Sequence, residues 1–232
     1  MKGYTTEIKR TFEALPFNHI IVANELYSSK LNEIPEKTFY KVVGRLAQNG
    51  QIVHLTKGIY YKPKHTKYGI VPISENEIVE YYTDDSNGML IGYRMYNSKG
   101  ITTQIGKNVI LLSKNLAEEK KTIGNVKVEK ANINFTDKNI ETIEMLEILQ
   151  NYKGIEDLNK KAFLNHAAIF AKKYSDEAAI YVIEHRKYKR STIAFLKRIL
   201  DDMDVNNSLG RYLSDLSNYA IPNVEGLNEV TH

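Results

Sequence analysis

The hydrophobic and polar positions between residues 34 and 64 predict one helix followed by a two-stranded hairpin. Four hydrophobic residues recur three and four positions apart, as on the buried face of a helix: Phe39, Val42, Val43 and Leu46. Pro35 suits the first turn of this helix, because the N–H that proline lacks has no partner there. Gly50 is expected to end the helix.

Two short runs rich in β-branched and aromatic residues follow the predicted helix. They span residues 52–55 and 59–62, and Thr56, Lys57 and Gly58 form the turn between them. A helix followed by such a hairpin is typical of a winged helix-turn-helix, a DNA-binding fold.

The face of the helix opposite its hydrophobic stripe is polar and basic, and no carboxylate follows Glu36 along it. Lys and Arg neutralise DNA phosphates, while Arg, Lys and Gln hydrogen-bond to base edges in the major groove. We therefore expect this region to bind double-stranded DNA; the alternative is a solvated surface of a small α+β unit. The predicted DNA-binding residues are Lys37, Thr38, Tyr40, Lys41, Arg45, Gln48, Lys57, Lys62 and Lys64.

The rest of the chain predicts an α+β protein of three domains. A helix over 5–15 and short elements over 20–22 and 24–29 complete a winged helix-turn-helix domain at 1–65. A capping box at 74–77, a helix over 92–99 and strands over 109–112 and 126–129 predict a small α+β domain at 66–134. Region 135–232 is expected to be a helical bundle, with helices over 137–152, 155–174, 176–187, 191–203 and 208–219 and a frayed tail after Pro222.

Charge is unevenly distributed along the 232 residues, although the net charge is only +4. Residues 1–65 carry ten Lys and Arg against five Asp and Glu. The basic excess therefore coincides with the segment that we expect to contact DNA. The densest basic run, His185 to Arg190, lies between two predicted helices. We interpret it as a solvated turn or, alternatively, as a second basic surface of Arg186, Lys187, Lys189 and Arg190 that contacts nucleic acid or a toxin.

The chain contains no cysteine, which excludes disulfides and thiolate metal sites. No hydrophobic run approaches the roughly 18 residues of a membrane span, and residues 1–11 lack the hydrophobic core of a signal peptide. We expect a cytoplasmic protein that does not bind membranes.

Three segments together resemble the AbiEi-like antitoxin family of type IV toxin–antitoxin systems and its DUF6088 relatives. They are NELY at 24–27, RLAQNGQIVHLTKGIYYKP at 45–63 and GMLIGYRMYNSKGITTQIGKNVILLS at 88–113. The second is similar to the helix and wing of that family, and the third to the start of its second domain.

This resemblance implies an antitoxin with two activities. The winged helix would bind inverted repeats in the promoter of its own operon and repress it. The C-terminal region would counter a nucleotidyltransferase-like toxin encoded alongside, with or without direct contact.

The sequence contains no recognisable enzyme signature. Walker, GxGxxG and GxSxG motifs are missing, and the six histidines lack the spacing of a zinc site. We therefore expect no catalytic residue, metal or cofactor. The alternative to an antitoxin is a winged-helix transcriptional regulator whose helical domain senses a ligand or partner, without a toxin.

Overall fold

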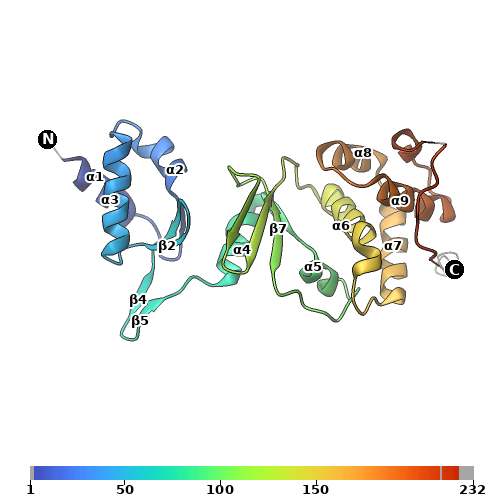
Figure 1. Cartoon of the computed structure of the whole chain (residues 1–232), viewed down its shortest axis with the longest axis horizontal. Helices are drawn as coiled ribbons and strands as arrows, with labels where there is room; N and C mark the ends of the chain where they lie inside the picture. Colours follow the sequence, from blue (N-terminus) through green and yellow to red (C-terminus); the bar gives the residue numbers. More distant parts are fainter. Residues whose placement is uncertain (1–2, 215, 225–232) are drawn as a thin grey trace. The chain divides into compact units, whose positions relative to one another are not determined.

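The computed structural model describes residues 3–214 and 216–224, and its fold is mixed α+β (Figure 1). The chain divides into two compact units, Met1–Tyr81 with Thr122–Val126, and Tyr82–Lys121 with Lys127–His232. The three-domain division at residues 65 and 134 remains a prediction. The tail expected to fray after Pro222 lies largely outside the described residues, since 225–232 are not described.

The first unit combines helices with a small sheet and a separate hairpin. Its elements are α1 (Tyr4–Glu13), β1 (Ile20–Val22), α2 (Ala23–Leu26), the π-helical turn η1 (Tyr27–Leu31), α3 (Glu36–Gln48), β2 (Val53–Thr56), β3 (Ile59–Tyr61), β4 (Lys64–Thr66), β5 (Gly69–Val71) and α4 (Glu75–Thr83). The first three strands form an antiparallel sheet in the order β1-β3-β2. β4 and β5 form a separate antiparallel hairpin, which the sequence pattern did not predict.

Helix α3 packs its hydrophobic stripe against the rest of this unit, as predicted. Phe39 is fully buried, and its ring centroid lies 6.5 Å from that of Phe12 on α1 and 5.2 Å from that of Tyr27. Val42, Val43 and Leu46 are also buried. The stripe therefore fixes which face of α3 remains exposed.

A Schellman motif ends α3 at the glycine that the sequence indicated. Gly50 has a φ of +69°, a conformation that costs glycine little. The N–H of Gly50 donates to the carbonyl of Ala47 at 3.1 Å, and the N–H of Gln51 donates to the carbonyl of Leu46 at 2.9 Å. These bonds satisfy carbonyl groups at the end of the helix and direct the chain into β2.

The predicted capping box opens α4. The Glu77 N–H donates to the Ser74 hydroxyl at 3.2 Å, and the Ser74 N–H donates to the Glu77 carboxylate at 2.7 Å. These reciprocal bonds satisfy the first free N–H groups of the helix. They also lower the pKa of Glu77, to which the backbone bond from Ser74 contributes most.

The remaining elements combine a four-stranded sheet with further helices. They are η2 (Asp84–Ser86), β6 (Gly88–Ile91), α5 (Tyr93–Ser98), β7 (Val109–Ser113), β8 (Lys120–Ile123), β9 (Val126–Lys130), α6 (Asp137–Asn151), η3 (Tyr152–Gly154), α7 (Lys160–Lys173), α8 (Asp176–His185), α9 (Arg190–Asp202) and η4 (Leu209–Tyr212). The sheet order is β6-β7-β9-β8. Helix α6 contacts α7, α8 and α9, and its residues Ile143, Met145, Leu146 and Ile148 are fully buried.

The helix expected over 208–219 is wrong. Among the residues of this range that the structure describes, only the short 3₁₀ turn η4 forms, and Leu213 is extended. Ser208 is held instead by Asp176 of α8, whose carboxylate accepts its N–H at 2.9 Å. Gly210 further disfavours a helix because glycine loses the most backbone entropy. Among the described residues, no helix is long and hydrophobic enough to cross a membrane.

Candidate nucleic-acid interface

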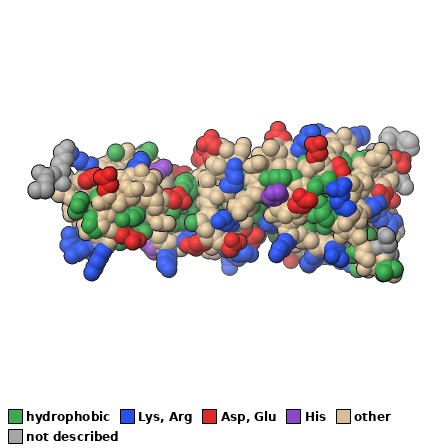
Figure 2. Space-filling view, turned by 90° about the horizontal axis from the view of Figure 1, so that it is seen from above, with side chains coloured by type: hydrophobic (Ala, Val, Ile, Leu, Met, Phe, Trp, Pro, Cys, Tyr) green, Lys and Arg blue, Asp and Glu red, His purple; other side chains and the backbone are tan. Residues whose placement is uncertain are grey.

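Helix α3 presents the predicted basic side chains on its exposed face. Lys37, Lys41, Arg45 and Gln48 are exposed, Tyr40 is 39% exposed, and Thr38 is half-buried at the edge of the face. We call the exposed residues Lys37, Tyr40, Lys41, Gly44, Arg45 and Gln48 the α3 face. In the space-filling view, Lys and Arg side chains project along one edge of the unit that contains α3 (Figure 2).

The cations of the α3 face are not paired with any carboxylate in the described part of the chain. Lys37, Lys41 and Arg45 form no ion pair with any residue that the structure describes. Gly44 is exposed, and a Cβ atom added there would meet no atom within 4 Å. The face therefore combines uncompensated positive charge with a point where a ligand can approach the backbone closely.

The hairpin of β2 and β3 adds a further lysine. Lys57 is exposed in its turn beside Gly58, whose φ is +76°. The carbonyl of Gly58 accepts the N–H of Ala23 at 2.9 Å, which ties the turn to the start of α2. The register shifts between His54 and Thr56, so a bulge bends β2 just before the turn.

Lys62 has a different role from the one the sequence suggested. Its ammonium group donates to the backbone carbonyls of Glu13 and Leu15, the latter at 2.7 Å, and lies 5.0 Å from the centroid of the Phe17 ring. These carbonyls lie at the C-terminal end of α1, where a helix leaves acceptors unsatisfied and favours a cation. Lys62 is thus occupied within the fold, and we leave it out of the proposed interface.

Lys64 lies on β4, in the second hairpin rather than behind the first. It is exposed, and so are Lys67 and Tyr68 at the tip of the same hairpin. The Lys67 ammonium lies 4.9 Å from the centroid of the Tyr68 ring, which is 88% exposed. The sequence analysis did not predict these two residues, although a glycine at position 69 is a sequence signal for a turn. In the structure Gly69 has a φ of +114°.

The second basic run divides into inward and outward residues. Arg186 forms ion pairs with Glu147 at 2.9 Å and Glu129 at 3.7 Å. The Tyr188 hydroxyl donates to Glu147 at 3.2 Å, and burial raises the pKa of Tyr188, with a further contribution from Glu147. Arg186 therefore neutralises a buried carboxylate and is not part of the second basic surface that the sequence predicted. The other three residues of that surface, Lys187, Lys189 and Arg190, are exposed.

Comparison with known protein families identifies one match. Residues 24–162 match the profile of DUF6088, a family of unknown function. This range covers more than half of the chain, so the chain belongs to the DUF6088 family. No curated protein matches the chain.

The contacts of Lys62 generate a prediction about stability. Lys62→Met removes two charge-assisted hydrogen bonds to the end of α1, so the free energy of unfolding should fall by about 1–3 kcal/mol. Urea unfolding followed by circular dichroism measures this change. The matched control, Lys64→Met on exposed β4, should stay within about 0.5 kcal/mol of the wild type. Equal stability of the two variants would contradict the role assigned to Lys62.

Proposed function

We propose that this protein binds double-stranded DNA through a winged helix-turn-helix formed by α1 to β3. One observation carries the proposal: the α3 face holds three cations that no described carboxylate pairs with, beside an antiparallel hairpin. An α-helix fits the major groove of B-DNA, which is about 12 Å wide. Neutralising phosphates is the main source of affinity for such a surface.

The side chains of the α3 face suit two kinds of contact. Arg45 and Gln48 carry the planar donors that pair with base edges, so we assign them to sequence recognition. Lys37 and Lys41 are assigned to phosphates, as are Lys57 on the first hairpin and Lys64 on the second. Tyr40 on the face and Thr38 at its edge have hydroxyl groups that donate to phosphate oxygens.

We further propose that the protein is the antitoxin of a type IV toxin–antitoxin system. It would repress its own operon at promoter inverted repeats and counter a nucleotidyltransferase-like toxin, and it would act in the cytoplasm. Support comes from the resemblance at residues 24–27, 45–63 and 88–113, since all three segments lie within the range 24–162 that matches DUF6088.

A second candidate function is that of a winged-helix regulator without a toxin, whose helical region senses a ligand. A cavity between α6 and α9 favours this candidate. The regulator would release DNA when a small molecule is added, and its gene would stand alone. These two observations would distinguish it from the antitoxin. A neighbouring nucleotidyltransferase gene favours the antitoxin.

Substitution of the α3 face tests DNA binding. Arg45→Ala should cost about 1–3 kcal/mol of binding free energy and relax sequence preference, because it removes a base contact. Lys41→Ala should weaken binding to all sequences and reduce the salt slope by about 1. Fluorescence anisotropy with the promoter duplex and a scrambled duplex at several salt concentrations measures both effects.

The control for these variants is Lys9→Ala, which removes an exposed cation from α1 outside the α3 face. It should leave the affinity within about twofold of the wild type. Undiminished promoter binding by the folded Lys41→Ala/Arg45→Ala double variant would rule out α3 as the reading helix.

Co-expression tests the antitoxin role separately. The adjacent open reading frame is induced alone, with this protein, or with the Lys41→Ala/Arg45→Ala variant. We expect growth arrest with the first and rescue with the other two, because neutralisation is assigned to the C-terminal region rather than to α3. An adjacent gene that is harmless, or arrest that the wild-type protein does not relieve, would overturn the antitoxin role and leave the DNA-binding role intact.

A further inference from the structure

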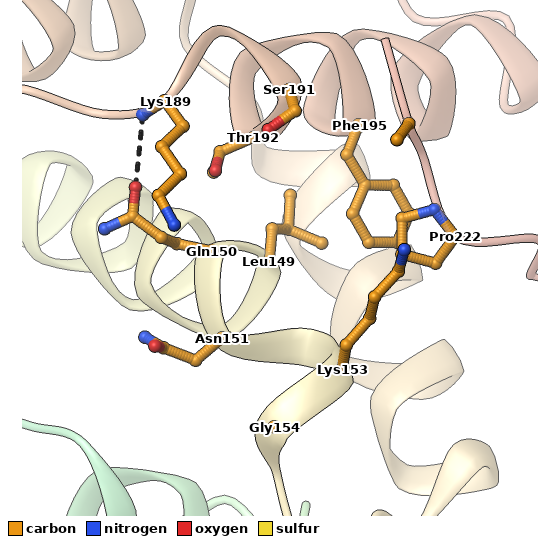
Figure 3. A pocket seen from close by; sticks show the side chains of 11 residues that line it. Leu149, Gln150, Asn151, Lys153, Gly154, Lys189, Ser191, Thr192, Phe195 and Pro222 are labelled. Atoms are coloured by element: carbon orange, nitrogen blue, oxygen red, sulfur yellow. Dashed lines mark hydrogen bonds between the residues drawn. The ribbon is translucent and has the colours of Figure 1, made fainter.

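The second unit contains a cavity of about 400 Å³ between the C-terminal end of α6 and the N-terminal end of α9 (Figure 3). This volume falls in the range of small-molecule sites. Its lining has a polar side with Gln150, Asn151, Lys189, Ser191 and Thr192. The other side has Leu149, Phe195 and Pro222, with Lys153 beside Pro222, and Gly154 and Ala220 complete the lining.

The charge of the cavity lining favours an anion. Lys153 and Lys189 are both exposed, and no lining residue that the structure describes is acidic. In Figure 3 the Lys189 side chain extends beside Gln150, and the Lys153 side chain extends toward Pro222. A bound anion would therefore meet positive charge without a nearby carboxylate to repel it.

The start of α9 contributes free backbone donors to the same side. Its N-cap residue, Lys189, makes no side-chain capping bond. The N–H groups of Arg190 and Ser191 find no acceptor among the described residues. The N-terminal end of a 13-residue helix carries a partial positive charge, and such N–H groups bind phosphate oxygens.

Thr192 provides an independent indication that the cavity binds a ligand. The residue is only 3% exposed, and it lines the cavity, where its hydroxyl points inward in Figure 3. That hydroxyl has no hydrogen-bond partner among the described residues. The hydroxyl oxygen is not fully buried, because it keeps some accessible surface in the cavity. It can therefore donate a hydrogen bond to an acceptor oxygen of a ligand there.

Gln150 holds the polar side of the cavity in place. Its side-chain oxygen accepts the N–H of Lys189 at 3.1 Å, which fixes the segment before α9 against α6. The amide NH₂ of Gln150 then remains as a further donor on the polar side. Donors thus converge from α6 and α9, while Phe195 and Pro222 offer a hydrophobic wall on the other side (Figure 3).

We propose that this cavity binds the 5′-phosphate of a nucleotide. The phosphate lies at the start of α9, where it accepts hydrogen bonds from Thr192 and the free backbone N–H groups and pairs with Lys189. The flat base lies against Pro222 and the small exposed edges of Phe195 and Leu149, which are 2% and 4% exposed. The nucleotide is either a free mononucleotide or the 5′-phosphorylated end of a nucleic acid. This site lies on elements other than α3 and does not depend on DNA binding there.

Isothermal titration calorimetry of the full chain tests the proposal. The probes are the four nucleoside 5′-monophosphates, the matched nucleosides and inorganic phosphate. We expect at least one monophosphate to bind, with its nucleoside and inorganic phosphate each at least about tenfold weaker, because each lacks one half of the recognised group. A 5′-phosphorylated trinucleotide and its 5′-hydroxyl counterpart distinguish the two sources: competition by the phosphorylated trinucleotide alone indicates that the end of a nucleic acid is also accepted.

Variants connect the binding to the cavity. Lys189→Gln should weaken the monophosphate about tenfold, and Thr192→Val, which keeps the side-chain shape, about threefold to tenfold. The control Lys187→Gln removes an exposed cation two residues away that does not line the cavity, and it should change affinity less than about twofold. Circular dichroism confirms that each variant is folded.

Three results would overturn the proposal. The first is no binding of any monophosphate or of the phosphorylated trinucleotide at millimolar concentration. The second is equal affinity for inorganic phosphate and the monophosphates, which would remove the role of the hydrophobic wall. The third is an equal loss of monophosphate affinity in Lys189→Gln and Lys187→Gln. Equal losses would mean that the ligand is attracted by net charge and does not bind in the cavity.

Discussion

The packing of α3 on α1 and η1 is the interaction on which the account of this protein rests. Phe39 is fully buried, and its ring packs near those of Phe12 and Tyr27. Burial of such a side chain contributes about 1.5–3 kcal/mol. Because α3 has 3.6 residues per turn, the burial of one stripe decides the orientation of all other side chains. Lys41 and Arg45 are therefore exposed as a consequence of the core. Because α3 is held in place by its hydrophobic face, the cations on its opposite face need no carboxylate partner within the protein.

Whether a cation is free or occupied separates the basic residues of this chain. Lys62 and Arg186 are both found in basic segments, yet one closes the end of α1 and the other neutralises the buried carboxylate of Glu147. Arg186 and Glu147 stabilise each other only as a pair, since either one alone would be a costly buried charge. The cations of the α3 face and Lys189 have no such partner among the described residues, so their positive charge is available to a ligand. Local charge counts alone do not make this distinction.

The sequence predicted the elements whose signals are local. Three predicted features are present in the structure: the stripe from Phe39 to Leu46, the glycine that ends α3, and the capping box at Ser74 and Glu77. Each depends on residues that lie within a few positions of one another. The sequence did not predict features that depend on partners far away along the chain. Lys62 meets carbonyls almost fifty positions away, and Ser208 is drawn to Asp176 on another helix. The cavity at the start of α9 likewise requires α6 beside it, so only the folded chain brings Thr192 and Gln150 together.

The most direct test of the account is a photo-crosslink from the α3 face to DNA. A photoreactive amino acid replaces Lys41 in one variant and Lys9 of α1 in another, and each is irradiated in complex with the promoter duplex. The account predicts crosslinks from position 41 that map to one stretch of bases within the promoter, and none from position 9. Intact DNA binding with crosslinks from position 9 and none from position 41 would contradict it, because another surface of the protein would then lie against the duplex.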